Sequence, residues 1–397
     1  MGRILSSWRP AAALLIAATL VVLTAPGTRA HKGVTSKYNY NQHVFPILRD
    51  RCGQCHFEGG PTPMSLMTYR DAIPWAESIR EQLIGQKQPP WYADPTGPAV
   101  RGGHALALKE LDILVTWAAG GTPQSTEMTF TGGGTPAGDA AAPPAFAPDV
   151  TKWRSGRPDL AVKMEAPYTL PSTAVEDVRE FILPTNLAEE KWVSAVDLLP
   201  GTPSIVMDAV VSIEKGPVLG AWIAGEEPVP APSGAAFRLP VGAKLHLRIH
   251  YKKQWRDESA EKSDLSTVGL YFTDAPLGGR ALEALSLKAP DPATDAAGPR
   301  TLTGVLNTAA RVVGIRPGVD QPYARVEIDA VLPAGRRVRL LRLRAPQPQY
   351  YRRYWLVEPI ELPKNSKVEV TMTPAPHDEG SVRKQSPLQV DLEYVPQ

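Results

Sequence analysis

The chain of 397 residues lacks many of the features that point to a function: it has two cysteines, a formal net charge of only +2, and no Gly-rich phosphate loop. A charge balance this close to neutral gives no support to nucleic-acid binding, which needs a basic surface. The acidic residues form no convincing acid/base pair, and nothing marks a substrate pocket with a nucleophile and its base. After residue 30 no segment is apolar enough to span a membrane. These absences leave the two cysteines as the most informative residues.

The two cysteines occur together, in Cys52-Gly53-Gln54-Cys55-His56. This C-x-x-C-H spacing is the attachment signature of a c-type haem. Two thiols three positions apart can form thioether bonds to both vinyl groups of one porphyrin, and the histidine can bind the iron. A redox dithiol would need a βαβ context, a zinc site would need two further ligands, and a disulfide across two residues would be strained. We predict haem c bound by Cys52 and Cys55, with His56 as the proximal ligand.

The first 30 residues have the pattern of a signal peptide. Arg3 and Arg9 lie before an apolar run at residues 11–25, and Thr28-Arg29-Ala30 offers a cleavage site with small residues at its first and third positions. The alternative is an uncleaved anchor, although this run is shorter than the ~20 residues that a spanning helix needs. We therefore expect a periplasmic or secreted protein, which associates with a membrane only if this segment is not cleaved.

Residues 31–123 have helical periodicity. We expect three helices, over residues 41–51, 69–85 and 107–118. The order of helix, haem motif, loop and a final helix containing Trp117 is that of a small cytochrome c, so we assign a haem domain to residues 31–123. Residues 124–150 are rich in Gly, Pro, Ala and Thr, a composition that cannot bury much apolar surface, and we predict a linker there.

After Val150 the apolar residues alternate with a period of two, in about ten to fourteen short strands separated by Pro- and Gly-rich turns. Such a series predicts all-β sandwiches, which we place at residues 151–276 and 277–397. The predicted fold class is therefore multidomain α plus all-β: a small helical cytochrome c-like domain followed by a pair of jelly-roll-like β-sandwiches.

Both regions resemble known families. The N-terminal region resembles the cytochrome c-like domains of large bacterial exported proteins, in residues 44–48, 52–56, 63–66, 74–76, 89–91 and 117–123. In many such proteins this domain precedes a pair of β-sandwiches similar to the type II ascorbate-dependent copper monooxygenases, of which the peptidylglycine hydroxylases are members. Here the second likeness rests on Ile249-His250-Tyr251 and on residues 353–364.

The chain departs from the copper enzymes at their metal ligands. The family uses five histidines and a methionine, including a tandem His-His and a His-x-His, whereas residues 204–208 and 312–317 contain no histidine at the matching places. His246 and His250 share a strand face roughly 13 Å apart and cannot chelate one metal unaided. We therefore expect a degenerate copper module that has lost most of its ligands and its monooxygenase activity; bound copper stays an alternative. His250 stays a candidate vestigial copper ligand, with Met207 or His246 beside it.

The sixth coordination position of the iron is open to several residues. In many of the cytochromes that this region resembles, a methionine directly before Pro-Pro fills it. Here Gln88 stands before Pro89-Pro90, and an amide is a poor ligand for haem iron. We prefer His104, which precedes the last predicted helix, and place Met64 next. A five-coordinate iron is the remaining alternative and would permit ligand chemistry.

The predicted function is that of an exported mono-haem c-type cytochrome. It would transfer electrons to or from a redox partner protein or electron carrier, while the β module serves binding or docking. Two alternatives stay open. One is a copper oxidoreductase or monooxygenase fed with electrons by the haem, and the other is a non-catalytic surface or assembly protein.

Overall fold

The computed structural model describes residues 35–90, 92–102, 105–125, 146–289, 299–348, 351–375 and 388–397. The predicted signal peptide at residues 1–30, most of the predicted linker at 124–150, and His104 lie outside these residues. Within the described ranges, no helix is long and apolar enough to cross a membrane.

The N-terminal part forms short helices around a small apolar core. They are η1 (Tyr40–Val44), α2 (Phe45–Arg51), α3 (Tyr69–Ala72), η2 (Ile73–Trp75), α4 (Ala76–Ile84) and α5 (Leu108–Ala119). The Glu110 carboxylate accepts the backbone N–H of Ala107 at 2.7 Å where α5 begins. Leu114 and Trp117, three positions apart on α5, face the core and are fully buried. The helices expected from periodicity are confirmed, and the middle one is divided at Pro74, which cannot donate an intrahelical hydrogen bond.

The first β unit comprises residues 160–273. Its strands are β1 (Leu160–Lys163), β2 (Tyr168–Leu170), β3 (Glu176–Pro184), β4 (Lys191–Leu199), β5 (Val206–Ile213), β6 (Val218–Ile223), β7 (Phe237–Leu239), β8 (Lys244–Lys252), β9 (Lys262–Asp264) and β10 (Thr267–Thr273). They form two four-stranded antiparallel sheets, in the orders β1-β10-β4-β7 and β3-β8-β5-β6, and a small β2-β9 pair. Apolar residues at alternate positions of both larger sheets contribute to one hydrophobic cluster, as the period of two requires.

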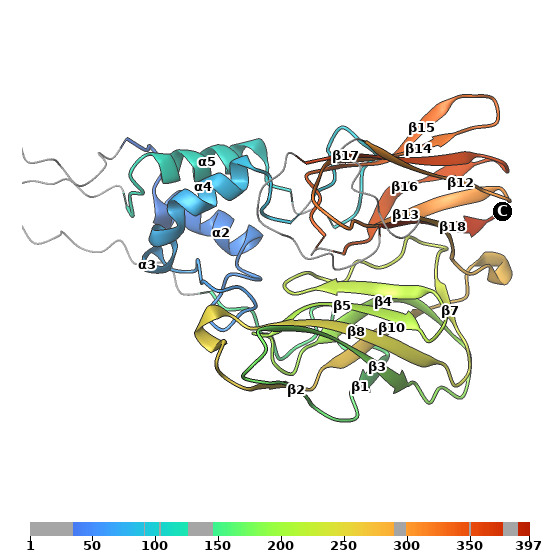
Figure 1. Cartoon of the computed structure of the whole chain (residues 1–397), viewed down its shortest axis with the longest axis horizontal. Helices are drawn as coiled ribbons and strands as arrows, with labels where there is room; N and C mark the ends of the chain where they lie inside the picture. Colours follow the sequence, from blue (N-terminus) through green and yellow to red (C-terminus); the bar gives the residue numbers. More distant parts are fainter. Residues whose placement is uncertain are drawn as a thin grey trace, which may run out of the picture.

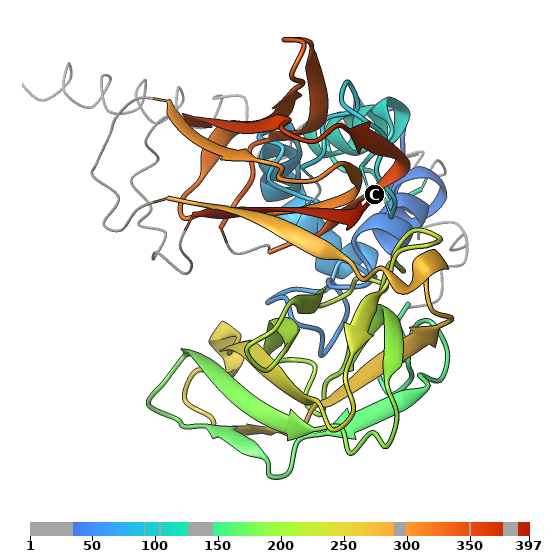
Figure 2. The same cartoon turned by 90° about the vertical axis from the view of Figure 1, so that its right-hand side faces the viewer.

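The second β unit comprises residues 283–396. Its strands are β11 (Glu283–Lys288), β12 (Arg300–Val305), β13 (Ala310–Gly318), β14 (Tyr323–Val331), β15 (Arg337–Arg344), β16 (Tyr354–Leu362), β17 (Lys367–Pro374) and β18 (Gln389–Pro396). They form two further four-stranded sheets, β11-β18-β13-β16 and β12-β17-β14-β15, which share a second hydrophobic cluster. Figure 2 shows the two β units one above the other, with the blue and cyan helices beside both.

The segment between α4 and α5 belongs structurally to the second β unit. Ala93 forms an antiparallel bridge with Leu343 of β15, and Val100 forms one with Leu356 of β16. Tyr92 is 3% exposed and lies within the core of the second β unit. Figure 1 shows this cyan segment among the orange and red strands.

The predicted fold class is wrong. In place of a small helical cytochrome domain followed by a pair of jelly-roll-like sandwiches, the protein is mostly β, with 40% strand and 14% helix, and its framework is four four-stranded sheets. The helices are short, and the segment between two of them is built into the β framework. Helical periodicity shows which side chains face a core, but it does not show whether that core is self-contained.

Candidate functional site

The Cys52–His56 motif forms a tight turn directly after α2. The N–H of Cys52 donates to the carbonyl of Leu48 in the last turn of that helix, at 2.9 Å. The N–H groups of Cys55 and His56 then both donate to the carbonyl of Cys52, at 3.1 and 2.9 Å. Both cysteines are free thiols and form no disulfide. The turn therefore brings two thiols and an imidazole together, as the spacing predicts.

His56 is held by backbone groups of the loop that follows it. Its Nδ1 lies 3.3 Å from the carbonyl oxygen of Met64, and its own carbonyl accepts the N–H of Leu66 at 3.0 Å. A carbonyl only accepts, so Nδ1 carries the proton and Nε2 carries the lone pair. Burial lowers the pKa of His56, with the bond to Met64 opposing the shift. Among the described residues no hydrogen-bond partner is found for Nε2, and a neutral imidazole with an anchored Nδ1 and an available Nε2 is the form that binds iron.

The two thiols are poorly suited to thiol–disulfide chemistry. Burial raises the pKa of Cys52 to about 12, and Cys55 adds to this effect. Burial also raises the pKa of Cys55 to about 12, assisted by Glu226 and opposed by Arg154. Redox dithiols need a lowered pKa because the thiolate is the reactive species. The raised pKa values therefore count against a redox dithiol, and haem attachment at these thiols stays a prediction.

Residues of the first β unit, and Arg154 in the segment just before it, cover one side of the motif. The Cys55 thiol donates to the carbonyl of Ala224, just after β6, at 3.0 Å. Arg154 donates to the side-chain oxygen of Gln54 at 2.6 Å and to the carbonyl of Gly225 at 3.2 Å. In addition, the Gln254 amide donates to the carbonyl of Gly60. The motif and its loop are therefore held against the β framework at several points.

The backbone of Gly225 lies close to the motif. Its φ is +86°, a conformation that other residues rarely adopt, and a Cβ there would lie 2.4 Å from the Cys55 sulfur. Only a residue without a side chain lets the β6 turn contact the motif in this way. Thioether formation would remove the weak S–H donor to Ala224 but would leave this backbone contact in place.

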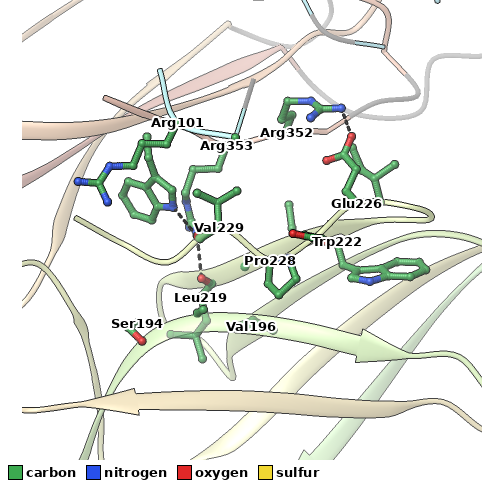
Figure 3. A pocket seen from close by; sticks show the side chains of 17 residues that line it. Arg101, Ser194, Val196, Leu219, Trp222, Glu226, Pro228, Val229, Arg352 and Arg353 are labelled. Atoms are coloured by element: carbon green, nitrogen blue, oxygen red, sulfur yellow. Dashed lines mark hydrogen bonds and ion pairs between the residues drawn. The ribbon is translucent and has the colours of Figure 1, made fainter. Parts of the chain in front are cut away.

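One small pocket lies between the two β units, and a second lies beside the motif. Figure 3 shows the larger, with Arg101, Arg352 and Arg353 above it and Leu219 below. Arg352 pairs with Glu226, and Arg353 donates to the carbonyl of Leu219 at 2.7 Å. The cavity volumes of about 60 and 40 Å³ suit a few water molecules. Neither pocket has the 300–1,000 Å³ typical of a small-molecule site, so neither suggests a substrate.

Of the two candidates for the sixth iron ligand, the structure describes Met64 and not His104. His104 lies outside the described residues. The carbonyl of Met64 faces Nδ1 of His56, and the ring's Nε2 points in roughly the opposite direction. The Met64 carbonyl therefore lies on the Nδ1 side of the imidazole. The choice between His104 and Met64 stays a prediction.

His250, the candidate vestigial copper ligand, lies on β8 between two carboxylates. Its Nδ1 is 2.7 Å from Asp208 of β5, and its Nε2 is 2.7 Å from Glu176 of β3. Hydrogen bonds to Asp208 and Glu176 raise the pKa of His250 against the opposing effect of burial. His246, on the same strand, instead lies 3.3 Å from Glu180.

Both ring nitrogens of His250 are thus engaged, on opposite sides of the ring, so neither is free for a metal. Among the described residues, no group of three or more His, Cys, Asp or Glu side chains is placed to hold a metal ion. The copper assignment of His250 stays a prediction to which this geometry gives no support.

Several residues around the motif carry no signal in the sequence. Arg154, Gly225 and Gln254 lie about 100 to 200 positions from the motif and meet it only through folding. Thr62 is closer, but nothing in the run Pro61-Thr62-Pro63 indicates that its hydroxyl contacts backbone carbonyls of the motif loop. These residues could be found only from the fold.

Comparisons with known proteins assign no family. No family model matches the chain, and no curated protein matches it. Solved structures that align with it include one from Bacteroides ovatus assigned as an α-L-fucosidase (11% identity, 60% of this chain and 39% of that one, TM-score 0.18). Others are a xanthan lyase from Paenibacillus (13% identity, 67% and 28%, TM-score 0.16) and an allantoicase (10% identity, 54% and 75%, TM-score 0.18).

The chain thus spans less than half the length of the first two of these structures. At such scores the likenesses support neither a shared fold nor a shared activity.

Proposed function

We propose that the protein is an exported mono-haem c-type cytochrome, with haem attached to Cys52 and Cys55 and with His56 as the proximal iron ligand. The observation that carries the proposal is the state of His56: a neutral imidazole, anchored at Nδ1 by the Met64 carbonyl, directly follows two free thiols in one turn. When bound, the haem supplies one-electron chemistry at its iron. The chain supplies the covalent attachment, the ligand and its orientation.

The β units support this role as a rigid setting for the motif. Contacts from Arg154, Gly225 and Gln254 fix the motif loop to the first β unit. The segment at 92–101 fixes the helical part to the second β unit. The haem would therefore not sit in a mobile domain. A redox partner protein or electron carrier would meet one combined surface of helices and strands, and the β units would serve its docking.

The sixth ligand in this proposal is His104, with Met64 second. The reason is the place of His104 in the sequence, in the loop before the last helix, from where it could approach the iron from the side opposite His56. Export to the periplasm or beyond completes the proposal, because c-type haem is attached outside the cytoplasm.

The test is expression of the full chain together with a haem-maturation system, followed by spectroscopy of the denatured protein. We expect a haem band that stays with the polypeptide after denaturation, and its loss in the Cys52→Ala, Cys55→Ala double variant. His246→Gln, which alters a partly exposed histidine on β8, is the matched control and should keep the band. A double variant that retains the covalent chromophore would refute the proposal.

A further inference from the structure

The loop at residues 57–66 returns to the haem motif and contacts it at three points. The Thr62 hydroxyl donates to the carbonyl of Cys55 at 2.8 Å, and His56 Nδ1 donates to the carbonyl of Met64 at 3.3 Å. The N–H of Leu66 donates to the carbonyl of His56 at 3.0 Å. A Cβ at Gly60 would lie 2.6 Å from the Cys55 carbonyl oxygen, so glycine allows the loop to come this close. The loop is therefore shaped around His56.

Thr62 lies between the backbone carbonyls of Cys55 and Met64. Its Oγ1 is 2.8 Å from the Cys55 oxygen and 3.2 Å from the Met64 oxygen. A hydroxyl has one proton, so the shorter contact is the main hydrogen bond and the longer one is a weak second branch. The Met64 carbonyl is in turn the acceptor for the imidazole N–H. One side chain thus sets the distance between the backbone of the motif and the group that orients its histidine.

The hydrogen bond from His56 to Met64 is long, at 3.3 Å, and so depends on how well the carbonyl is held. The partner at the outer nitrogen of a metal-bound histidine fixes the ring orientation and raises the basicity of the ligand. A more basic axial ligand stabilises the oxidised iron and lowers the reduction potential.

We propose that Thr62 is a positioning residue for the proximal ligand: its hydroxyl keeps the Met64 carbonyl facing His56 Nδ1 and thereby lowers the reduction potential of the haem. This inference rests on the proposed function. Thr62 does not contact the iron, so its action is through the Met64 carbonyl and the imidazole.

The test is a redox titration of the haem-loaded full chain with two substitutions. Thr62→Val removes the hydroxyl and keeps the branched shape, while Thr62→Ser keeps the hydroxyl and serves as the control. We expect Thr62→Val to favour reduction about tenfold, which for one electron is a rise of about 59 mV. Thr62→Ser should have the potential of the unaltered chain. A Thr62→Val potential equal to that of Thr62→Ser, or lower, would overturn the inference.

The two proposals fail in different ways in this experiment. If the unaltered chain carries no covalent haem, the proposed function fails. If it carries haem and Thr62→Val leaves the potential unchanged, only the role of Thr62 fails. Should Thr62→Val not yield the haem-loaded protein, Thr62→Ala removes the same hydroxyl.

If neither of these variants loads haem, exchange of the His56 Nδ1 proton is followed by NMR in the haem-free unaltered chain, Thr62→Ser and Thr62→Val. We expect slow exchange in the first two and faster exchange in Thr62→Val, and equal exchange in all three would overturn the inference.

Discussion

His56 and His250 are both enclosed by the fold, and their neighbours are of opposite character. His56 meets a neutral backbone carbonyl at one nitrogen, and burial lowers its pKa. His250 lies between Asp208 and Glu176, which raise its pKa although burial opposes them. A neutral imidazole with one free nitrogen can bind a metal, while an imidazolium engaged at both nitrogens is a structural cation. The comparison shows that the surroundings, and not the residue type, separate a candidate ligand from an ion-pair partner.

The largest effect that this comparison implies is on stability, at His250. Replacing it in His250→Ala would leave the largely buried Asp208 carboxylate without its cation, while Glu176 keeps Lys252 at 3.4 Å. We expect the free energy of unfolding to fall by about 3–5 kcal/mol, measured by denaturant titration, because breaking a buried ion pair strands the remaining charge. Covalent haem content should not change.

The control for this variant is His246→Ala. Its contact with Glu180 is more exposed, with side-chain exposures of 33% and 60%, against 7% for His250. Exposed pairs contribute little, so its effect should stay below about 1 kcal/mol. Equal losses in the two variants would show that His250 is not a specially enclosed cation.

A second substitution, Gly225→Ala, tests the packing around the motif that contains His56. Gly225→Ala would place a Cβ 2.4 Å from the Cys55 sulfur at a φ of +86°. We expect it to lower the free energy of unfolding by about 1–3 kcal/mol through overpacking, beyond any backbone strain, and to reduce haem attachment.

Gly156→Ala is the matched control. It has nearly the same backbone conformation, with φ at +81°, but nothing within 4 Å of the added Cβ. The difference between the two variants isolates the contact with the motif. If both variants lose the same stability and attach haem equally, the β6 turn does not determine the geometry of the motif.

The smallest expected effect is a pH dependence that His250 contributes. Because its pKa is raised above 6.5 in the folded protein, its stabilising effect is fully present below about pH 6.5. The effect is lost as the pH rises through the folded pKa. Partial burial opposes ionisation of Glu176, but its hydrogen bond to His250 and the charge of Lys252 lower its pKa below 4.5. The stabilisation that Glu176 contributes is therefore lost as the pH falls below 4.5. Unfolding titrations from pH 5 to 9 should show a stability difference between the unaltered chain and His250→Gln that shrinks toward alkaline pH. A difference that grows with pH would contradict a charged His250.

Local features of this protein could be predicted from its sequence, and non-local ones could not. Helical spacing located α5, and C-x-x-C-H spacing located the motif, because each depends on residues within a few positions of one another. The fold class failed because periodicity assigns each segment to helix or strand without showing what its apolar face packs against. Residues 92–101 show this most clearly: they lie between two helices, yet they pair with β15 and β16.

The candidate site shows the same limit. The sequence predicts a role for Cys52, Cys55 and His56 from their spacing, but His250 could not be interpreted without its partners, which come from positions 42 and 74 residues away. Likewise, the contact of Thr62 with two carbonyls depends on how the loop returns to the motif. A residue's type and spacing suggest a role, and its neighbours in space decide whether it can perform that role.

The measurement that tests the central claim most directly is the intact mass of the full chain after export in cells that mature c-type cytochromes. A chain that binds haem through Cys52 and Cys55 should gain the mass of one haem, and this gain should persist in denaturant. A mass equal to that of the polypeptide alone, with both thiols still open to alkylation, would contradict the account.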